Sequence, residues 1–191
     1  DSPWGRGFPG WHIECSAMSV HYLGATFDIH TGGIDHVRVH HSNEVAQSEC
    51  ALGVHPWVRY WLHNEFYDFG GEKISKSKGH TLVLQDLVDR GFDPLAFRFF
   101  FLQGHYRQQQ SFSIEAMEAA ATGHRRLLAQ AFELREATGP VDEARIAPLR
   151  ERFRAAICDD LNAPRALAVT FEVLRSELAP AERRALLLGF D

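Results

Sequence analysis

The sequence predicts an α/β layer followed by an all-α helical bundle, and the distribution of residue types indicates this order. Twelve of the 15 glycines and all four tryptophans precede residue 113, whereas 17 of the 22 alanines follow it. The first part alternates β-branched or aromatic stretches with glycine turns and helical stretches. The second part carries apolar residues at helical period. We therefore expect two domains, residues 1–112 and residues 113–191.

In the first part, helices and short strands are expected to alternate between turn residues. Residues 11–23 predict a helix after a turn-rich segment, and residues 26–30 a short buried strand that ends at a glycine pair. Residues 40–52 predict a helix closed by Gly53. The remaining elements are a strand near the end of 57–66 and short helices over 82–89 and 94–102. This is too little chain for a complete nucleotide-binding sheet of about five or six strands.

The second part predicts helices throughout. Residues 114–137 form the longest of them and end at Gly139-Pro140. Residues 148–158 and 164–178 predict two more, the latter opened by Asn162 with Pro164 in its first turn. Residues 179–188 predict a last short helix.

Composition excludes several classes of protein. With 191 residues, 45% of them hydrophobic and 24% charged, the chain can form a globular core. A net charge of −5 does not fit a general nucleic-acid coat. The longest apolar stretches are interrupted, as by Arg98, so we expect no membrane helix and no membrane partner. Three cysteines without a short pairing pattern favour a reducing, cytoplasmic location. No signal peptide is visible at Asp1, and a start upstream of it stays open.

A candidate metal site combines three kinds of donor. His40 and Glu44 are four residues apart in a predicted helix, so both project from one face. Cys15 lies on another predicted helix and would be the third corner. Thiolate, imidazole and carboxylate together suit Zn²⁺. Cys50 is better explained as a small buried apolar residue. His41 faces another direction than His40, and an ordinary hydrogen bond explains it as well as metal binding does.

A second candidate site is basic and rich in glycine. All three lysines of the chain fall between Lys73 and Lys78, flanked by Gly70-Gly71 and Gly79. Clustered ammonium groups and hydroxyls on a glycine-flanked loop can follow phosphate charge, although a solvated basic loop has the same composition. Gly32 and Gly33 follow a predicted strand, and Asp35 could accept ribose hydroxyls, although such turns are common.

Taken together, these segments resemble the class I aminoacyl-tRNA synthetases, specifically the cysteinyl-tRNA synthetase family. Residues 10–18 read GWHIECSAM and resemble that family's zinc-cysteine segment, and residues 27–35 read FDIHTGGID, similar to its nucleotide-binding turn. Residues 40–48, HHSNEVAQS, resemble its second zinc segment, and residues 73–77, KISKS, its lysine signature. Residues 104–107 and 159–164 are similar to segments of its helical, tRNA-binding region. The resemblance covers nearly the whole chain.

The resemblance implies a partial Rossmann-like class I catalytic half followed by the helical tRNA-binding domain. It implies ATP-dependent activation of cysteine and its transfer to tRNA, with ATP bound as its Mg²⁺ complex. It also implies that Cys15, His40 and Glu44 bind Zn²⁺. Trp11 and His30 would line the cysteine pocket. The implied ATP-binding residues are Gly32, Gly33, Asp35, Ser75, Lys76 and Ser77. Lys73 and Lys76 would be catalytic, stabilising phosphate charge in the transition state.

Some features depart from the family pattern. The sequence holds no His-x-Gly-His half-site and no fourth zinc cysteine, and Thr31 and Ser42 replace a usual glycine and glutamate. Because that class holds ATP between two half-sites, we expect this chain not to catalyse adenylation alone. A separate chain supplying the first half-site is a possible partner. The alternatives are a non-catalytic truncated paralogue that acts as a binding or regulatory module, and the cysteine ligase of mycothiol synthesis.

Overall fold

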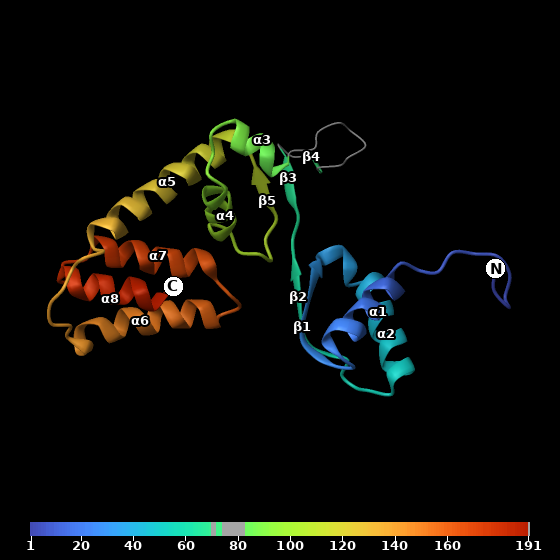
Figure 1. The fold of residues 1–191 in the computed structure, drawn as a ribbon. Helices are drawn as coiled ribbons and strands as arrows, with labels where there is room; N and C mark the ends of the chain where they lie inside the picture. The colour runs from blue at the N-terminus through green and yellow to red at the C-terminus, as the bar shows by residue number, and fades with distance from the viewer. Residues whose placement is uncertain (70–71, 74–82, 191) are drawn as a thin grey trace. The chain divides into compact units, whose positions relative to one another are not determined.

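The computed structural model describes residues 1–69, 72–73 and 83–190 (Figure 1). The chain forms two compact units, Asp1–Phe66 and Tyr67–Asp191, and each is described by itself. The domain division predicted at residue 113 stays a prediction. None of the helices in the described ranges is long and apolar enough to cross a membrane.

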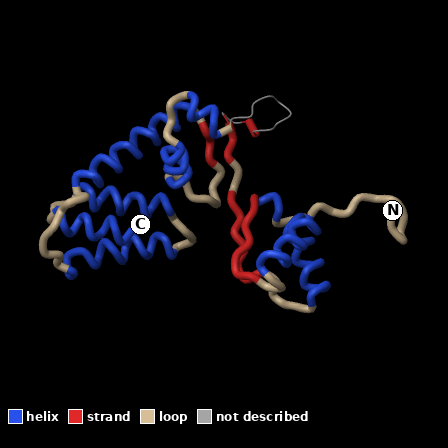
Figure 2. The backbone as a smooth tube through the Cα atoms, viewed as in Figure 1, coloured by secondary structure: helices blue, strands red, loops and turns tan. Residues whose placement is uncertain are grey.

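The first unit is built around one parallel strand–helix–strand motif. Its elements are α1 (His12–Leu23), β1 (Phe27–Gly33), the 3-10 turn η1 (Ile34–His36), α2 (His40–Leu52) and β2 (Val58–Asn64). Strands β1 and β2 pair in parallel, with Phe27 opposite Val58 and Gly33 opposite Asn64. Figure 2 shows the two strands beside the helices α1 and α2. A parallel pair needs a crossover connection, and η1 with α2 supplies it.

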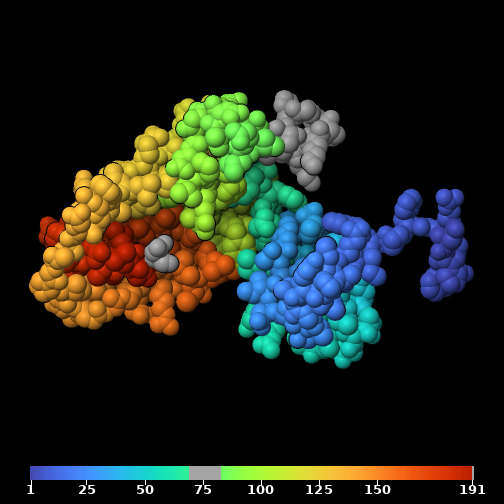
Figure 3. All heavy atoms as spheres, in the orientation of Figure 1, coloured from blue at the N-terminus to red at the C-terminus, as the bar shows by residue number. Residues whose placement is uncertain are grey.

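The buried side of α2 is polar. Its four fully buried residues are His40, His41, Glu44 and Ser48. Apolar packing in this unit comes instead from Trp57, which is fully buried beside Phe27 at the start of the sheet. Buried polar groups cost free energy unless they are satisfied, so this face needs polar partners from the elements packed against it. The residues before α1 are exposed, and the space-filling view shows them extending away from the helices of this unit (Figure 3).

The second unit begins with a small sheet. Strands β3 (Tyr67–Phe69), β4 (Glu72–Lys73) and β5 (Gln110–Phe112) have the order β4-β3-β5, with β4 antiparallel and β5 parallel to β3. Helices α3 (Leu84–Asp89) and α4 (Pro94–Leu102) lie between β4 and β5 in the chain. Asp93 caps α4 by accepting a hydrogen bond from the Leu95 amide at 2.8 Å. Phe99, Phe100 and Phe112 are buried in one core with Met117.

Four helices complete this unit: α5 (Ile114–Glu133), α6 (Glu143–Cys158), α7 (Ala163–Arg175) and α8 (Pro180–Phe190). The side chains of Ser113, Asp142 and Asn162 cap the first three. Ile146, Val173 and Leu186, one from each of the last three helices, form a fully buried cluster. The helices α6, α7 and α8 pack side by side (Figure 1).

The predicted fold class, an α/β part followed by helices, is confirmed. The predicted start of α6 at Pro148 is wrong, since the helix begins at Glu143 and the proline lies inside it. Asp142 caps the earlier turn, and proline removes one backbone donor without ending the helix. Strands β3, β4 and β5 were not predicted, because two or three residues are too few to show a period.

Candidate metal and nucleotide site

Helix α2 and helix α1 bring the three predicted metal donors together. His40 and Glu44 are one turn apart on the buried face of α2, with 4% and 0% of their surface exposed. Cys15 comes from α1 and is half-buried. One donor atom from each of these residues lies within 4.8 Å of the others. The predicted grouping of Cys15, His40 and Glu44 is therefore present in the fold.

Polar contacts between the two helices set this arrangement. The hydroxyl of Ser48 donates to that of Ser16 at 2.9 Å, and the Gln47 amide donates to the His12 carbonyl at 2.8 Å. Gln47 also donates to Ser16, at 2.5 Å. Ser16 is the neighbour of Cys15, so these bonds hold the thiol against the inner face of α2.

Glu44 is the centre of the cluster. Its Oε1 lies 2.7 Å from Nε2 of His40, and its Oε2 lies 2.8 Å from Nε2 of His30 on β1. Neither contact has hydrogen-bond geometry, so both buried oxygens lack a donor among the described residues. A second group of possible ligands, His30, His41 and Glu44, shares this carboxylate. Buried polar atoms without partners call for an explanation, and a bound ion is one of the usual ones.

The electrostatics of the cluster are those of ligands without a cation. Burial raises the pKa of Glu44 to about 7. Burial, with the nearby charges of Glu44 and Glu14, raises the pKa of the Cys15 thiol. Burial and the neighbouring imidazoles lower the pKa values of His30 and His40. A divalent cation reverses these penalties, because it favours the thiolate, the carboxylate and the neutral imidazole.

The donor set fits zinc. Zn²⁺ accepts sulfur, nitrogen and oxygen donors in one tetrahedron, with bonds of about 2.0–2.3 Å that separate the donors by roughly 3.3–3.8 Å. Donor atoms within 4.8 Å of one another need little rearrangement to meet that spacing. The orphaned oxygens of Glu44 face the other donors, where a cation would satisfy them.

Trp11 and His30, the predicted cysteine-pocket residues, both lie at this cluster. The Trp11 ring packs on His40, with ring centroids 3.9 Å apart, and remains 59% exposed. His30 contacts Glu44 from β1. Both are therefore close enough to contact a molecule bound beside the metal ligands, and their roles stay predictions.

The glycine turn at the end of β1 is tightly packed. A Cβ on Gly32 would lie 2.5 Å from Cε1 of His41 and 2.8 Å from Nδ1 of His36. A Cβ on Gly33 would lie 2.5 Å from a carboxylate oxygen of Asp35. This turn is at the carboxyl end of a parallel strand, the usual position of ligands in α/β sheets. The assignment of Gly32, Gly33 and Asp35 to ATP stays a prediction.

Histidines outside the predicted metal site complete the cluster, among them His41, for which an ordinary hydrogen bond was one expectation. His41 is buried, and its Nδ1 lies 2.8 Å from Nε2 of His63 on β2. Burial and the neighbouring histidines lower the pKa of His41 to about 4. The signal for His36 and His41 was the density of histidines between residues 12 and 41. His63 had no such signal, since only the pairing of β1 with β2 places it opposite Gly32.

Two further expectations have different outcomes. Cys50 is exposed, so its interpretation as a small buried apolar residue is wrong: it lies near the solvent-facing end of α2. Lys73 is the last residue of β4. Ser75, Lys76 and Ser77 lie outside the described residues, so the lysine segment as a phosphate site stays a prediction.

Comparison with known proteins agrees with these features. Residues 1–122 match the family described as "tRNA synthetases class I (C) catalytic domain", and residues 152–176 match the DALR domain. The chain is 47% identical over 189 residues to a cysteine–tRNA ligase of Treponema denticola, covering 88% of this chain and 38% of that protein. It is 49% identical over 193 residues to cysteine–tRNA ligase 1 of Burkholderia lata, covering 100% of this chain and 40% of that protein.

The chain thus spans about two fifths of the length of these curated relatives. Among solved structures, the ternary complex of Agrobacterium radiobacter K84 agnB2 LeuRS with tRNA and LeuAMS matches with a TM-score of 0.63 at 18% identity. That match covers 85% of this chain and 25% of the solved chain. At this identity the likeness concerns the fold alone.

Proposed function

Because the chain belongs to the class I (C) tRNA synthetase catalytic-domain family, we propose that it is the cysteine-selecting and tRNA-facing part of a cysteine–tRNA ligase. The observation that carries this proposal is the buried carboxylate of Glu44, whose two oxygens lack donors while Cys15, His30 and His40 surround it. Such a site has the donors for a zinc ion in a place that a small substrate can reach past Trp11.

In this proposal Cys15, His40 and Glu44 hold the zinc. The bound metal supplies a soft Lewis acid that binds a thiolate far better than a hydroxyl, so it separates cysteine from serine, which differ in one atom. Glu44 neutralises part of the metal charge, and His30 contacts one of its oxygens from β1. Trp11 covers the site from the solvent side.

ATP is the proposed second substrate. The Gly32–Asp35 turn lies at the carboxyl end of β1, where nucleotides bind in α/β sheets, and the carboxylate of Asp35 accepts ribose hydroxyls. Lys73 and Lys76 stabilise the charge of the phosphates, with Ser75 and Ser77 contributing hydroxyls. The helices α5 to α8 are the proposed tRNA-facing part, in keeping with the DALR match over residues 152–176. The proposed compartment is the cytoplasm. The DALR match favours tRNA over an amino-sugar acceptor.

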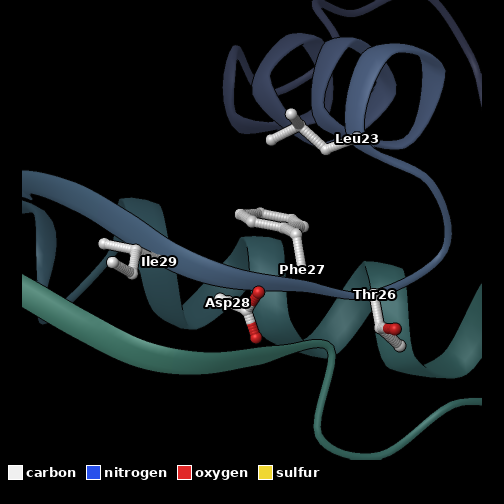
Figure 4. Close-up of a pocket in the computed structure, with 5 residues that line it drawn as sticks. All are labelled: Leu23, Thr26, Phe27, Asp28 and Ile29. Carbon is white, nitrogen blue, oxygen red and sulfur yellow. The ribbon is translucent and has the colours of Figure 1, made fainter.

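The open sheet of the first unit supports a proposal about the missing half-site. Each of β1 and β2 has one sheet neighbour in the described part of the chain. Ile29 and Tyr60, paired across the strands, are 62% and 68% exposed. A hollow of about 400 Å³ between α1 and β1 is lined by Leu23, Thr26, Phe27, Asp28 and Ile29 (Figure 4). Parallel sheets are normally covered on both faces. We infer that a segment carrying the first half-site, in the same polypeptide or a separate one, binds here.

Metal analysis tests the first proposal. The chain is expected to retain about one zinc per molecule after mild dialysis, through three protein ligands and water. Cys15→Ser and Glu44→Gln should lose it, whereas Cys50→Ser, which changes an exposed cysteine, should keep it. Zinc content that is equal in the Cys15→Ser and Cys50→Ser variants would refute the assignment. Isothermal titration of the loaded chain should show binding of cysteine and none of serine.

Cysteine-dependent ATP–pyrophosphate exchange tests the proposal that a segment carrying the first half-site binds to the first unit. The chain alone should show none above background, because one half-site cannot orient ATP. Addition of the first half of the Burkholderia lata relative should produce exchange. Ile29→Lys should abolish this complementation, and Leu128→Lys, at an exposed leucine of the other unit, should not. Exchange by the chain alone, or equal complementation by both variants, contradicts the proposal.

A further inference from the structure

Asp160 occupies an unusual position in the turn between α6 and α7. Its φ is 56°, and the φ of the following Leu161 is 53°, both in the left-handed region that residues other than glycine rarely adopt. Asparagine and aspartate tolerate this region better than other side chains, and leucine does not. Backbone strain of this kind persists when surrounding contacts hold it, and it points to a function for those contacts.

The contacts of Asp160 come from the segment before β5. Tyr106 donates its hydroxyl to Oδ1 at 2.5 Å, and Arg107 donates from Nε to Oδ2 at 2.5 Å and from Nη2 to Oδ1 at 3.1 Å. His105 adds a contact at 3.9 Å. Both oxygens are engaged by two adjacent residues, and the Arg107 pair is bidentate. These bonds hold the pKa of Asp160 at about 2.

The same segment is held at its other end by Asp68 of β3. Gln109 donates to Asp68 at 3.3 Å, and the Ser111 hydroxyl donates to it at 2.6 Å. Asp68 is also the register partner of Ser111 in β5 and of Lys73 in β4. The segment 105–111 is therefore hydrogen-bonded to two carboxylates. One is Asp160 of the helical bundle, and the other is Asp68 of the sheet that contains Lys73.

We propose that Asp160 is a positioning residue for the sheet of β3, β4 and β5, in which β4 ends at Lys73. Its side chain fixes residues 105–107, which through Gln109, Ser111 and Asp68 fix β3 and the neighbouring β4 that ends at Lys73. The helical bundle and the sheet then move as one body. The contribution to phosphate chemistry rests on the proposed function, whereas the mechanical link does not.

Two substitutions separate this role from a local role in the turn. Asp160→Asn keeps the shape and the tolerance of positive φ but removes the charge. Asp160→Gly removes all the side-chain bonds while it relieves the backbone strain. The matched control is Glu172→Gln, which breaks a similarly exposed bidentate pair, Arg152–Glu172, between α6 and α7 of the same bundle.

Amide hydrogen exchange on the full chain is the first measurement. Both Asp160 variants should increase exchange of the β3 and β5 amides by about 10-fold with little change in α6, α7 and α8, and Glu172→Gln should not. Unchanged exchange in β3 and β5 of Asp160→Gly would overturn the proposal, since it would limit Asp160 to its own turn. A uniform rise across all four helices would also overturn it.

The second measurement is the complemented exchange reaction. Both Asp160 variants should lower the rate at saturating cysteine and raise the KM for ATP about 10-fold, with an unchanged KM for cysteine and unchanged zinc content. An equal rise in both KM values would contradict a positioning role toward β4. If the unaltered pair shows no exchange, the proposed function fails, and the amide measurement still decides the link.

Discussion

Oε2 of Glu44 lies 2.8 Å from Nε2 of His30, so that a carboxylate on α2 meets an imidazole on β1 inside the first unit. Oε1 of the same carboxylate faces His40 at 2.7 Å. Glu44 thus joins the predicted metal ligands to a predicted substrate residue. Side chains around the proposed metal site differ in whether they would bind the metal or only position its ligands, and the zinc affinity of variants measures this difference.

In the proposed site, His30 would act on the metal through Glu44, which it contacts at 2.8 Å. His30→Ala should therefore leave the zinc stoichiometry near that of the unaltered chain and weaken the affinity by about 10–100-fold. Competition with a chromogenic chelator measures this. Loss of all zinc from His30→Ala would instead make His30 a direct ligand, as the second group of donors with His41 allows.

Ser48 holds α1 and α2 together beside the cluster. Ser48→Ala removes its hydrogen bond to Ser16, so Cys15 is less well positioned and zinc affinity should fall by about 10-fold. Ser42→Ala is the control, because Ser42 is an exposed residue on the same helix whose hydroxyl donates to the Val37 carbonyl and not to α1. The same chelator competition compares the two, and equal affinities would disprove the role of the interhelical bonds.

Gly32 has no room for a side chain. Gly32→Ala would place a Cβ against His36 and His41, and we expect a loss of about 1–3 kcal/mol in the free energy of unfolding. Gly7→Ala, where a Cβ meets nothing within 4 Å, should be neutral. Urea unfolding of both variants is the measurement, and a neutral Gly32→Ala would show that the two imidazoles move aside at little cost.

Asp160 makes stability depend on pH in the acidic range. Its pKa is about 2 in the folded chain against an ordinary 3.8, so its contribution is fully present above pH 3.8 and is lost as the pH falls through 2. The difference in urea midpoint between the unaltered chain and Asp160→Asn should be constant from pH 7 to pH 5. It should then shrink below pH 3.8. A difference that persists unchanged below pH 2 would contradict the assignment.

Glu182 ties α8 to the start of α6. Its buried carboxylate accepts hydrogen bonds from the Ala179 amide at 2.8 Å and from Arg145 at 3.2 Å. Glu182→Ala leaves these donors unpaired and should cost about 2 kcal/mol of unfolding free energy. Glu177→Ala, at an exposed position nearby, should change stability by less than about 0.5 kcal/mol. Equal effects in calorimetry would rule out the role of the buried carboxylate.

Helices with local signals could be predicted from the sequence almost to the residue. The helix over 40–52 matches α2, and that over 94–102 matches α4, because a proline start, a glycine end and apolar spacing are properties of neighbouring residues. The start of α6 and the three short strands could not be predicted. The start of α6 is set by the Asp142 cap, although Pro148 is itself a typical helix start. The strands depend on partners distant in the chain.

By itself, the sequence determined the order of an α/β part and a helical part, the family, and the donor types Cys15, His40 and Glu44. These follow from residue types and spacings along the chain. Only the tertiary structure decided that Glu44 is shared between His30 and His40, that His63 joins the cluster, and that Asp160 holds the segment leading to β5. The contacts of Glu44 with His30, of His41 with His63 and of Asp160 with Arg107 join residues distant in the chain. Strand register and helix packing, which no local pattern encodes, bring these residues together.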